Sequence, residues 1–374
     1  MTTFQSAHRT FKNYFVLPIA FLLFGISCST DATTLLDEDD SISEDVEETN
    51  DDTPSDEEVD TSGAVVFDQD FTLDATRTVA NYVLSQADYA QFLAGDGDIT
   101  MVAEKAYEYL DDDFDYIIIL SVEETQPSGL FYGRSHLIQN QVQGLGTGVY
   151  NNAASYGSAG KLKSIIYMPR TEYISNGPFL HEIAHSWGNK GIIPSTVGGH
   201  WGFASTAGQL GGFDQIEDLG NNTYRGSLNG QNGFGTFANG GNSVVYGALE
   251  LYTMGLIGPD ELGSIQVAVN PEWTQNAGEF TADAITTYTA QDLINEHGVR
   301  VPSVSDSQKD FKALTVVIST AEISQEQIDT ISANLENFSR QGAPDGSWGS
   351  LKNFWLATQG KATFDFTVAQ ESIQ

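Results

Sequence analysis

The stretch 177-GPFLHEIAHSWGNKG-191 places two histidines four residues apart, with a glutamate directly after the first histidine. Pro178 is favoured in the first turn of a helix, because its missing N–H has no partner there in any case. Gly188 and Asn189 are residues at which a helix commonly ends. The stretch therefore predicts a short helix, and the strands expected on either side of it decide the fold class.

The apolar residues of this helix recur at helical spacing. Leu180, Ile183, Ala184 and Trp187 form one stripe, which predicts the face that packs against the core. The two histidines and the glutamate lie outside this stripe. The pattern therefore predicts a helix that is anchored by one face and presents polar chemistry on another.

The polar residues have a spacing that suits a metal site. His181 and His185 lie one turn apart, so both imidazoles can reach one point in space. Two neutral imidazoles suit Zn²⁺, which lowers the pKa of its bound water from about 15.7 toward about 7. Glu182 can take a proton from that water and pass it to a leaving amine. The H-E-x-x-H pattern thus predicts a hydrolytic zinc site. The alternative is an ordinary pair of hydrogen-bonded histidines on a helix.

A catalytic zinc site normally has three protein ligands and one open position. His200, in 197-VGGHWGF-203, is our first choice for the third ligand, because it follows the helix and its flanking glycines allow a sharp turn. Glu250, on a second expected helix, is the alternative ligand. His136 lies upstream, and His297 ends an apparent surface helix where it complements the helix dipole.

Helix-like and strand-like segments alternate along the rest of the chain. The run 114–122 is continuously apolar and rich in β-branched residues, as is typical of a strand buried on both faces. Such a mixture of elements predicts one α/β or α+β domain spanning residues 64–374. The further helices are expected at 100–112, 243–256, 291–298 and 324–342, and the further strands at 163–170, 313–320 and 360–369.

The first 28 residues have the pattern of a targeting segment. A basic start precedes the apolar run 14-YFVLPIAFLLFGIS-27, which is short for a membrane span but suits a signal peptide. Cys28 follows directly and is the only cysteine, so no disulfide can form within the chain. The segment 24-FGISCS-29 resembles a bacterial lipoprotein signal with a lipidated cysteine, although Gly25 replaces the usual larger aliphatic residue. The alternative is a buried or leftover thiol. We expect an outer-membrane lipoprotein facing the cell surface or the periplasm.

Residues 29–63 are expected to form an acidic, disordered tether. The part from 31 to 62 contains 15 Asp and Glu residues and no Lys or Arg, so it cannot bury enough apolar surface to fold. An acidic stretch after the cysteine also resembles the surface-export signals of lipoproteins in the Bacteroidetes group. The whole chain has a formal net charge of −35 with only 16 basic residues, which argues against a nucleic-acid partner.

The strand–loop–strand–helix order around HEIAH resembles the zincin metallopeptidases. The run H-E-I-A-H-S-W-G matches the first part of the metzincin signature, H-E-x-x-H-x-x-G-x-x-H. It then departs from the signature, because Gly191 stands where metzincins have the third ligand. His200, nine residues later, can replace that ligand through a longer loop. The resemblance covers roughly residues 114–256.

This resemblance implies a zincin-like fold, with a mixed sheet and an active-site helix that carries HEIAH. It implies that His181 and His185 are zinc ligands and that Glu182 is the general base. It also suggests two places for Met254, either below the zinc as a methionine turn or simply in the core.

Two further features around the expected site stay open. Tyr246 or Tyr252 can stabilise an oxyanion, and the sequence does not choose between them. The Gly- and Asn-rich stretch 226–242 lies between the two candidate ligand segments. It is expected to rim the substrate cleft, to act as a mobile lid, or to be a plain surface loop.

Three functions follow from these patterns. The first is a tethered zinc metallopeptidase, an endopeptidase rather than an exopeptidase, which acts on proteins or peptides and reaches the membrane through its lipid anchor. The second is a non-catalytic surface binding or adhesion module with a structural or vestigial zinc site. The third is a hydrolase of a non-peptide amide in a glycan or cell wall. Glu182 favours the first function over the second, because a purely structural site does not need that carboxylate.

Overall fold

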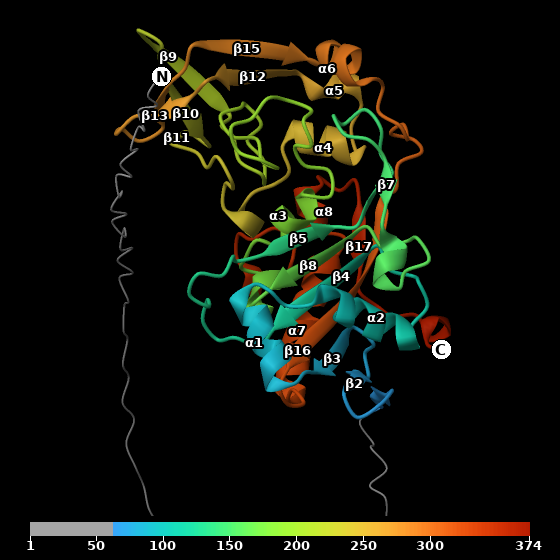
Figure 1. Cartoon of the computed structure of the whole chain (residues 1–374). Helices are drawn as coiled ribbons and strands as arrows, with labels where there is room; N and C mark the ends of the chain where they lie inside the picture. Colours follow the sequence, from blue (N-terminus) through green and yellow to red (C-terminus); the bar gives the residue numbers. More distant parts are fainter. Residues whose placement is uncertain (1–62) are drawn as a thin grey trace, which may run out of the picture. The chain divides into compact units, whose positions relative to one another are not determined.

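An eight-stranded mixed sheet is the largest element of this computed structural model, which describes residues 63–374 (Figure 1). The strand order is β1-β2-β3-β16-β4-β8-β5, and β17 pairs with β16. Strands β3, β16, β4 and β8 run parallel, whereas β2 and the edge strand β5 are antiparallel to their neighbours. The strands are β1 (Val65–Val66), β2 (Phe71–Leu73), β3 (Val79–Val83), β4 (Tyr116–Ser121), β5 (Arg134–Leu137), β8 (Ser164–Met168), β16 (Asp310–Ser319) and β17 (Thr363–Asp365). The predicted α/β class with a mixed sheet is confirmed.

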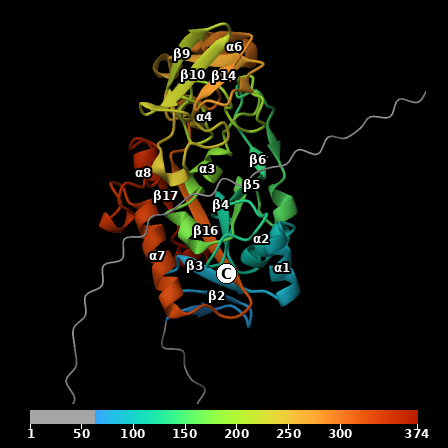
Figure 2. The same cartoon turned by 90° about the vertical axis from the view of Figure 1, so that its left-hand side faces the viewer.

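Helices cover both faces of this sheet, as Figure 2 shows. Ile118 and Leu120 of β4 belong to the core on the side of α3, α7 and α8. Ile117 and Ile119 belong to the second core, on the side of α1 and α2. Burial on both faces explains why β4 is a continuous apolar run. The helices are α1 (Gln86–Ala94), α2 (Ile99–Tyr109), α3 (Phe179–Ala184), α7 (Gln325–Ser339) and α8 (Phe354–Ala357).

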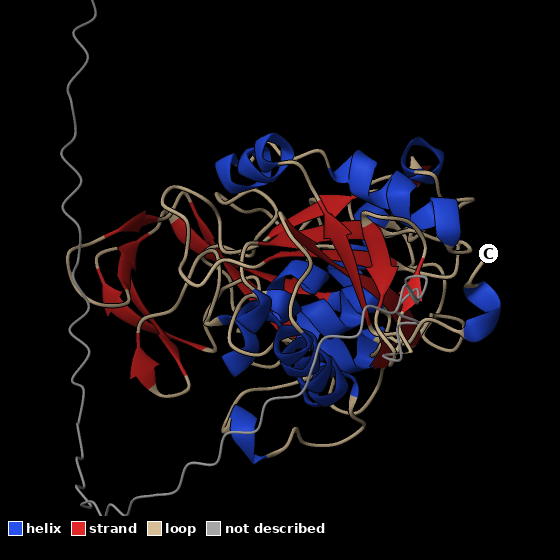
Figure 3. Cartoon of the chain, turned by 90° about the horizontal axis from the view of Figure 1, so that it is seen from below, coloured by secondary structure: helices blue, strands red, loops and turns tan. Residues whose placement is uncertain are grey.

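Smaller sheets and further short helices complete residues 63–374, and all of them except one strand pair follow α3 in the chain. Figure 3 shows strands that stand apart from the main sheet. A five-stranded sheet contains β9 (Gln215–Gly220), β10 (Thr223–Leu228), β11 (Gln231–Asn232), β13 (Glu272–Trp273) and β14 (Glu279–Thr281). Two pairs are formed by β12 (Ser264–Val269) with β15 (Ala284–Thr289), and by β6 (Gln139–Asn140) with β7 (Tyr150–Asn151). The remaining helices are α4 (Ala248–Met254), α5 (Pro259–Leu262) and α6 (Ala290–His297).

The predicted helices and strands are present, but their ends differ from the predicted ones. All the predicted helices and strands have counterparts, although the last strand is only β17. Gly255 ends α4 with φ 78°, as predicted. The prediction for the HEIAH helix is wrong in two details. Pro178 lies at the N-cap rather than inside the first turn, and the α-helix ends at Ala184. Beyond it the chain tightens, because Trp187 N–H donates to the carbonyl of Ala184, three residues back.

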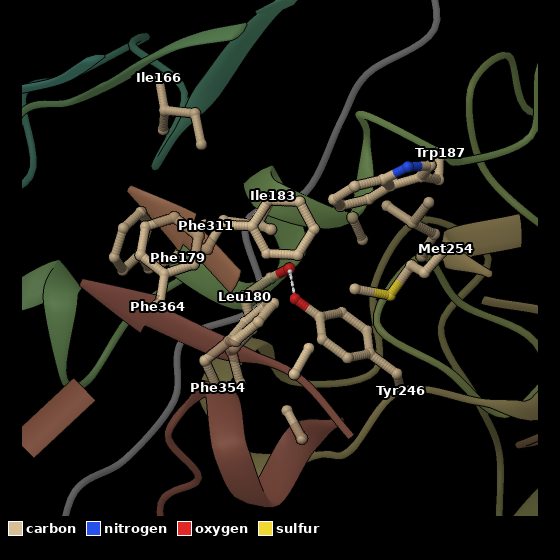
Figure 4. Close-up of a cluster of buried hydrophobic side chains, with 14 of the residues drawn as sticks. Ile166, Phe179, Leu180, Ile183, Trp187, Tyr246, Met254, Phe311, Phe354 and Phe364 are labelled. Carbon is tan, nitrogen blue, oxygen red and sulfur yellow. Dashed lines mark hydrogen bonds between the residues drawn. The ribbon is translucent and has the colours of Figure 1, made fainter. Parts of the chain in front are cut away.

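The apolar face of α3 is anchored as its spacing predicts. Leu180, Ile183 and Trp187 are buried in the core that also contains Tyr246 and Met254 (Figure 4). The Tyr246 hydroxyl donates a hydrogen bond of 2.9 Å to the carbonyl of Leu180. Helix α3, which carries His181 and has His185 as its C-cap, is therefore fixed by packing and by a buried hydrogen bond.

Candidate metal centre

The N-terminus of α3 is held by a residue distant in sequence. Pro178 provides no capping side chain, and Asn242 supplies the missing acceptor, because its Oδ1 accepts from Leu180 N–H at 3.0 Å. The Nδ2 of the same asparagine donates to the carbonyls of Ile174 and Ser175. One buried amide thus joins α3 to the segment that precedes it, which fixes where the first turn begins.

Three histidines meet beside α3. The ligand atoms of His181, His185 and His200 all lie within 4.8 Å of one another. Their ring centroids are 4.9 Å apart for His181–His185, 5.3 Å for His181–His200 and 4.9 Å for His185–His200. Within residues 63–374 no other group of three or more His, Cys, Asp or Glu side chains converges in this way. The structure therefore brings together the three histidines that the sequence singled out as ligands.

Hydrogen bonds fix the tautomer of two of these rings. Nδ1 of His181 lies 2.8 Å from the carbonyl oxygen of Gln209, and Nδ1 of His200 lies 2.7 Å from that of Gly198. A carbonyl only accepts, so each Nδ1 must donate, and each Nε2 keeps its lone pair. This arrangement is typical of metal-binding histidines, whose second nitrogen is oriented by a neighbouring acceptor.

The separation of the nitrogens fits a single metal ion. Nε2 of His185 lies 3.2 Å from Nε2 of His181. Two nitrogens each about 2.0–2.1 Å from one tetrahedral zinc lie about 3.3–3.4 Å apart. A donor set of three imidazoles suits zinc and also other transition metals, including copper, iron and nickel. The geometry thus supports a metal ion here, and the donor set does not choose among these metals.

Burial keeps these histidines uncharged. Desolvation lowers the pKa of His181 to about 4, although the hydrogen bond to Gln209 opposes the shift. Desolvation also lowers the pKa of His185 well below its usual value, and it lowers that of His200. Neutral imidazoles have the lone pairs that a metal requires, so the cluster is ready to bind a cation at neutral pH.

Glu182 is buried beside the cluster, and no ion pair within residues 63–374 involves it. Desolvation raises the pKa of Glu182 to about 8, and the backbone N–H of Ser135 in β5 partly offsets this shift. A Cβ added at Gly133 would lie 2.7 Å from both Cγ and Oε1 of Glu182. The carboxyl group therefore occupies space that exists only because residue 133 is glycine.

Glu250, the alternative third ligand, is directed elsewhere. Its buried carboxylate accepts hydrogen bonds from the indole N–H of Trp201 at 2.9 Å and from the backbone N–H groups of Gln209, Leu210 and Gly247 at 2.8–2.9 Å. Gln209 is also the residue whose carbonyl orients His181. Glu250 thus supports the peptide segment that positions a candidate ligand, and it does not join the histidine cluster.

The other predicted candidates also lie away from the cluster. Tyr246 and Tyr252 are buried, and neither lines the cleft at the histidines. Met254 packs in the core and contributes to a separate small cavity with Trp187. His297 contacts the carbonyl of Ile192 through Nε2 at 3.0 Å. The histidine cluster therefore forms without them.

A cleft of about 1070 Å³ opens at the histidines. Its walls include Gly133, Arg134 and Ser135 at the start of β5, together with Phe237 and Asn242 from the stretch 226–242. The first part of that stretch forms β10 and β11, and only its second part reaches the cleft. The prediction that this stretch rims the cleft is therefore confirmed for the second part alone.

No family model, curated protein or solved structure matches this chain. The site is therefore interpreted from its own residues and their geometry. The predicted signal segment with Cys28, and the acidic tether that follows it, lie outside the described residues. Among the helices of residues 63–374, none has the length and apolar character needed to cross a membrane.

Sequence reasoning missed the residues that orient the candidate ligands. The carbonyls of Gln209 and Gly198 belong to the backbone, which every residue provides, so no side-chain pattern marks them. Asn242 is one of several asparagines in a Gly/Asn-rich stretch, so the sequence alone does not indicate its contact with α3. Gly133 had no motif around it, and its role appears only when β5 is placed beside α3.

Proposed function

We propose that this chain is a zinc-dependent metallopeptidase of zincin-like fold. The observation that carries the proposal is the convergence of His181, His185 and His200 in a cleft that also contains Glu182. The predicted strands and helix correspond to β4, β8 and α3, whereas the predicted loop between the two strands contains β5, β6 and β7. Within residues 63–374, β5 is an edge strand of the main sheet and lines the cleft, which supports a peptide as the substrate, because a sheet edge can pair with an extended chain.

The residues of the site divide the reaction between them. His181, His185 and His200 would hold the ion through their imidazole nitrogens. Zinc held in this way would supply Lewis-acid chemistry, which lowers the pKa of a bound water toward about 7. Glu182 accepts the proton of the attacking water and donates it to the amine that leaves. The buried position of Glu182 limits competing hydrogen bonds from bulk water.

A purely structural metal site explains these residues less well. A buried carboxyl group without a cationic side-chain partner costs stability, and a structural site gains nothing from it. Structural zinc sites are also commonly closed by four protein ligands, whereas three potential ligands converge here. Both features favour hydrolysis over the adhesion function that the sequence left open.

Endopeptidase activity is supported by the size of the cleft. Its volume of about 1070 Å³ exceeds what a single amino acid or dipeptide needs, and it extends from β5 to the segment around Phe237. Incubation of the chain with a proteome-derived peptide library, read by mass spectrometry, tests the proposal. We expect new termini that arise from cleavage at internal peptide bonds of the library peptides. An intact library, together with release of acetyl or amide groups from cell-wall glycans, would favour the non-peptide alternative.

Gly133→Ala is expected to lower peptide hydrolysis by about 10–100-fold while metal content stays unchanged. The added methyl group would require space now filled by Cγ and Oε1 of Glu182, so the carboxyl group must move away from its position beside the histidines. Steady-state kinetics and metal analysis on the same preparation measure both effects. Gly129→Ala is a control for an added methyl group on the same loop, because nothing lies near its Cβ, although φ of 82° adds local strain there. Full activity in Gly133→Ala would mean that Glu182 does not act from this position.

We also propose that the chain is a lipoprotein attached through Cys28 and held from the membrane by its acidic tether. The single cysteine after an apolar run supports this localisation. Cys28→Ser is expected to move the protein from the membrane fraction to the soluble fraction, since a serine cannot accept the thioether-linked lipid. Fractionation with immunodetection measures the change, and membrane attachment of Cys28→Ser at the wild-type level would contradict the anchor.

A further inference from the structure

Exposed aromatic side chains of the described residues gather at the cleft. Within residues 63–374, four aromatic residues have exposed side chains. Three of them, Phe131, Tyr132 and Phe237, line the cleft. The fourth, Trp273 of β13, packs against the ring of Phe203. An apolar ring that faces water gains free energy when a ligand covers it, so this distribution points to a ligand that does so.

Phe237 lies directly beside the candidate metal ligands. Its ring centroid is 5.2 Å from that of His200, and the side chain is 61% exposed. A group bound against this ring would therefore lie next to the reacting atoms. Phe131 and Tyr132 come from the segment before β5, and Tyr132 is supported by the ring of Tyr173 at 5.8 Å.

The segment that carries Phe237 is pinned on both sides of it. Asn239 donates from Nδ2 to the carbonyl of Gly212 at 2.7 Å, and the carbonyl of Thr236 accepts from Gly202 N–H at 3.1 Å. These bonds hold the backbone while the phenyl ring stays exposed. Phe237 is therefore positioned as a wall of the cleft, which favours the rim interpretation of this segment over a mobile lid.

Charge is scarce in this cleft although the chain is strongly acidic. Arg134 and Glu182 are the only Lys, Arg, Asp or Glu residues that line it, and Glu182 is buried. The formal net charge of the chain is −35. A neutral apolar segment can enter without desolvating a charge, whereas an acidic peptide has the same sign of charge as the chain as a whole.

From these observations we infer that the cleft selects peptides by a large apolar or aromatic side chain, which binds against Phe237 next to the bond to be cleaved. The inference rests on the proposed function, because it names the substrate class of the same site. The position of β5 as an edge strand that lines the cleft favours a peptide over a glycan as the bearer of that side chain.

Binding to a Glu182→Gln form of the full chain, loaded with zinc, tests this selectivity without requiring turnover. Fluorescence anisotropy measures the Kd of short end-blocked peptides of Gly, Ser and Ala that differ only in one central residue: Phe, Leu, Ala or Glu. The Phe and Leu peptides are expected to bind about tenfold more tightly than the Ala peptide, and the Glu peptide more weakly than all of them. Adding Phe237→Ala should bring the Phe/Ala ratio of Kd values close to one, and Phe237→Tyr should retain it. Trp273→Ala, which removes an exposed ring outside the cleft, should leave the ratio unchanged.

The outcomes separate this inference from the proposed function. A Phe preference that survives Phe237→Ala would overturn the inference, as would tightest binding of the Glu peptide or no binding of any peptide. Binding of N-acetylglucosamine oligomers that depends on Phe237, in place of peptide binding, would also overturn it and assign the aromatic wall to a glycan. If the wild-type chain cleaves no peptide but the binding preference follows Phe237, the proposed hydrolysis fails while the selectivity stands.

Discussion

Glu182→Gln is expected to lower the rate of peptide hydrolysis by about 10²–10⁴-fold and to leave the metal content near that of the wild type. The amide has almost the same shape as the carboxyl group but cannot accept the proton of the attacking water. Metal content should persist because the three histidine nitrogens are unchanged, and Glu182 is not one of the converging ligands. Steady-state kinetics on a cleaved library peptide, with metal analysis of the same sample, measure both quantities.

The stability of this variant is a useful control. Burial raises the pKa of Glu182 to about 8, which means that its charged form is disfavoured at this position before a cation binds. A neutral glutamine therefore should not destabilise the metal-free fold, and thermal melting should show an unchanged or higher Tm. Retained hydrolysis in a folded Glu182→Gln protein would refute the role of Glu182 as general base.

His200→Ala is expected to raise the Kd for zinc substantially. Loss of a hydrogen bond to a metal ligand costs roughly 10–100-fold in metal affinity, and loss of a ligand itself should cost more. The substitution removes one of the three nitrogens that converge in the cleft. Hydrolysis should fall with the loss of metal, and excess zinc should restore little of it, because two histidines leave the ion poorly held. Competition with a zinc chelator of known affinity measures the change in Kd.

Glu250→Gln is the matched comparison for the alternative ligand. The glutamine side chain would accept hydrogen bonds from only some of the four donors that Glu250 now binds. Because the other donors lose their acceptor, the free energy of unfolding is expected to fall on the order of 1–3 kcal/mol. Zinc should remain bound at saturating concentration, because Glu250 is not one of the converging ligands and reaches them only indirectly, through the backbone of Gln209 and the indole of Trp201. Loss of zinc from Glu250→Gln with full retention in His200→Ala would reverse the two assignments.

The parts of the fold that the sequence predicts are those with local, periodic patterns. The long apolar run of β4 and the amphipathic spacing of α7 need no knowledge of the rest of the chain. Strand β5 was not predicted, because Arg134–Leu137 has neither the length nor the alternation of a typical strand. Its conformation results from antiparallel pairing with β8, which is a tertiary effect. The end of α3 at Ala184 was missed for a similar reason, since Gly188 suggested a longer helix.

The same distinction applies to the site. His181, Glu182 and His185 are recognisable because their chemistry is compressed into five consecutive residues. His200 was favoured by its flanking glycines, and the structure brings it to the other two histidines. The role of Glu250 could not be found in this way, because its partners Gln209 and Leu210 are about 40 residues distant and bind through their backbones. Phe237 lies among glycines and asparagines, where nothing local indicates its position beside His200.

Removal and restoration of zinc tests the central claim most directly. The full chain is expected to contain about one zinc ion, bound by His181, His185 and His200. Treatment with a chelator should abolish cleavage of a peptide identified in the library screen, and addition of one equivalent of zinc should restore it. Cleavage that continues at an unchanged rate after complete removal of metal, confirmed by metal analysis, would contradict the account.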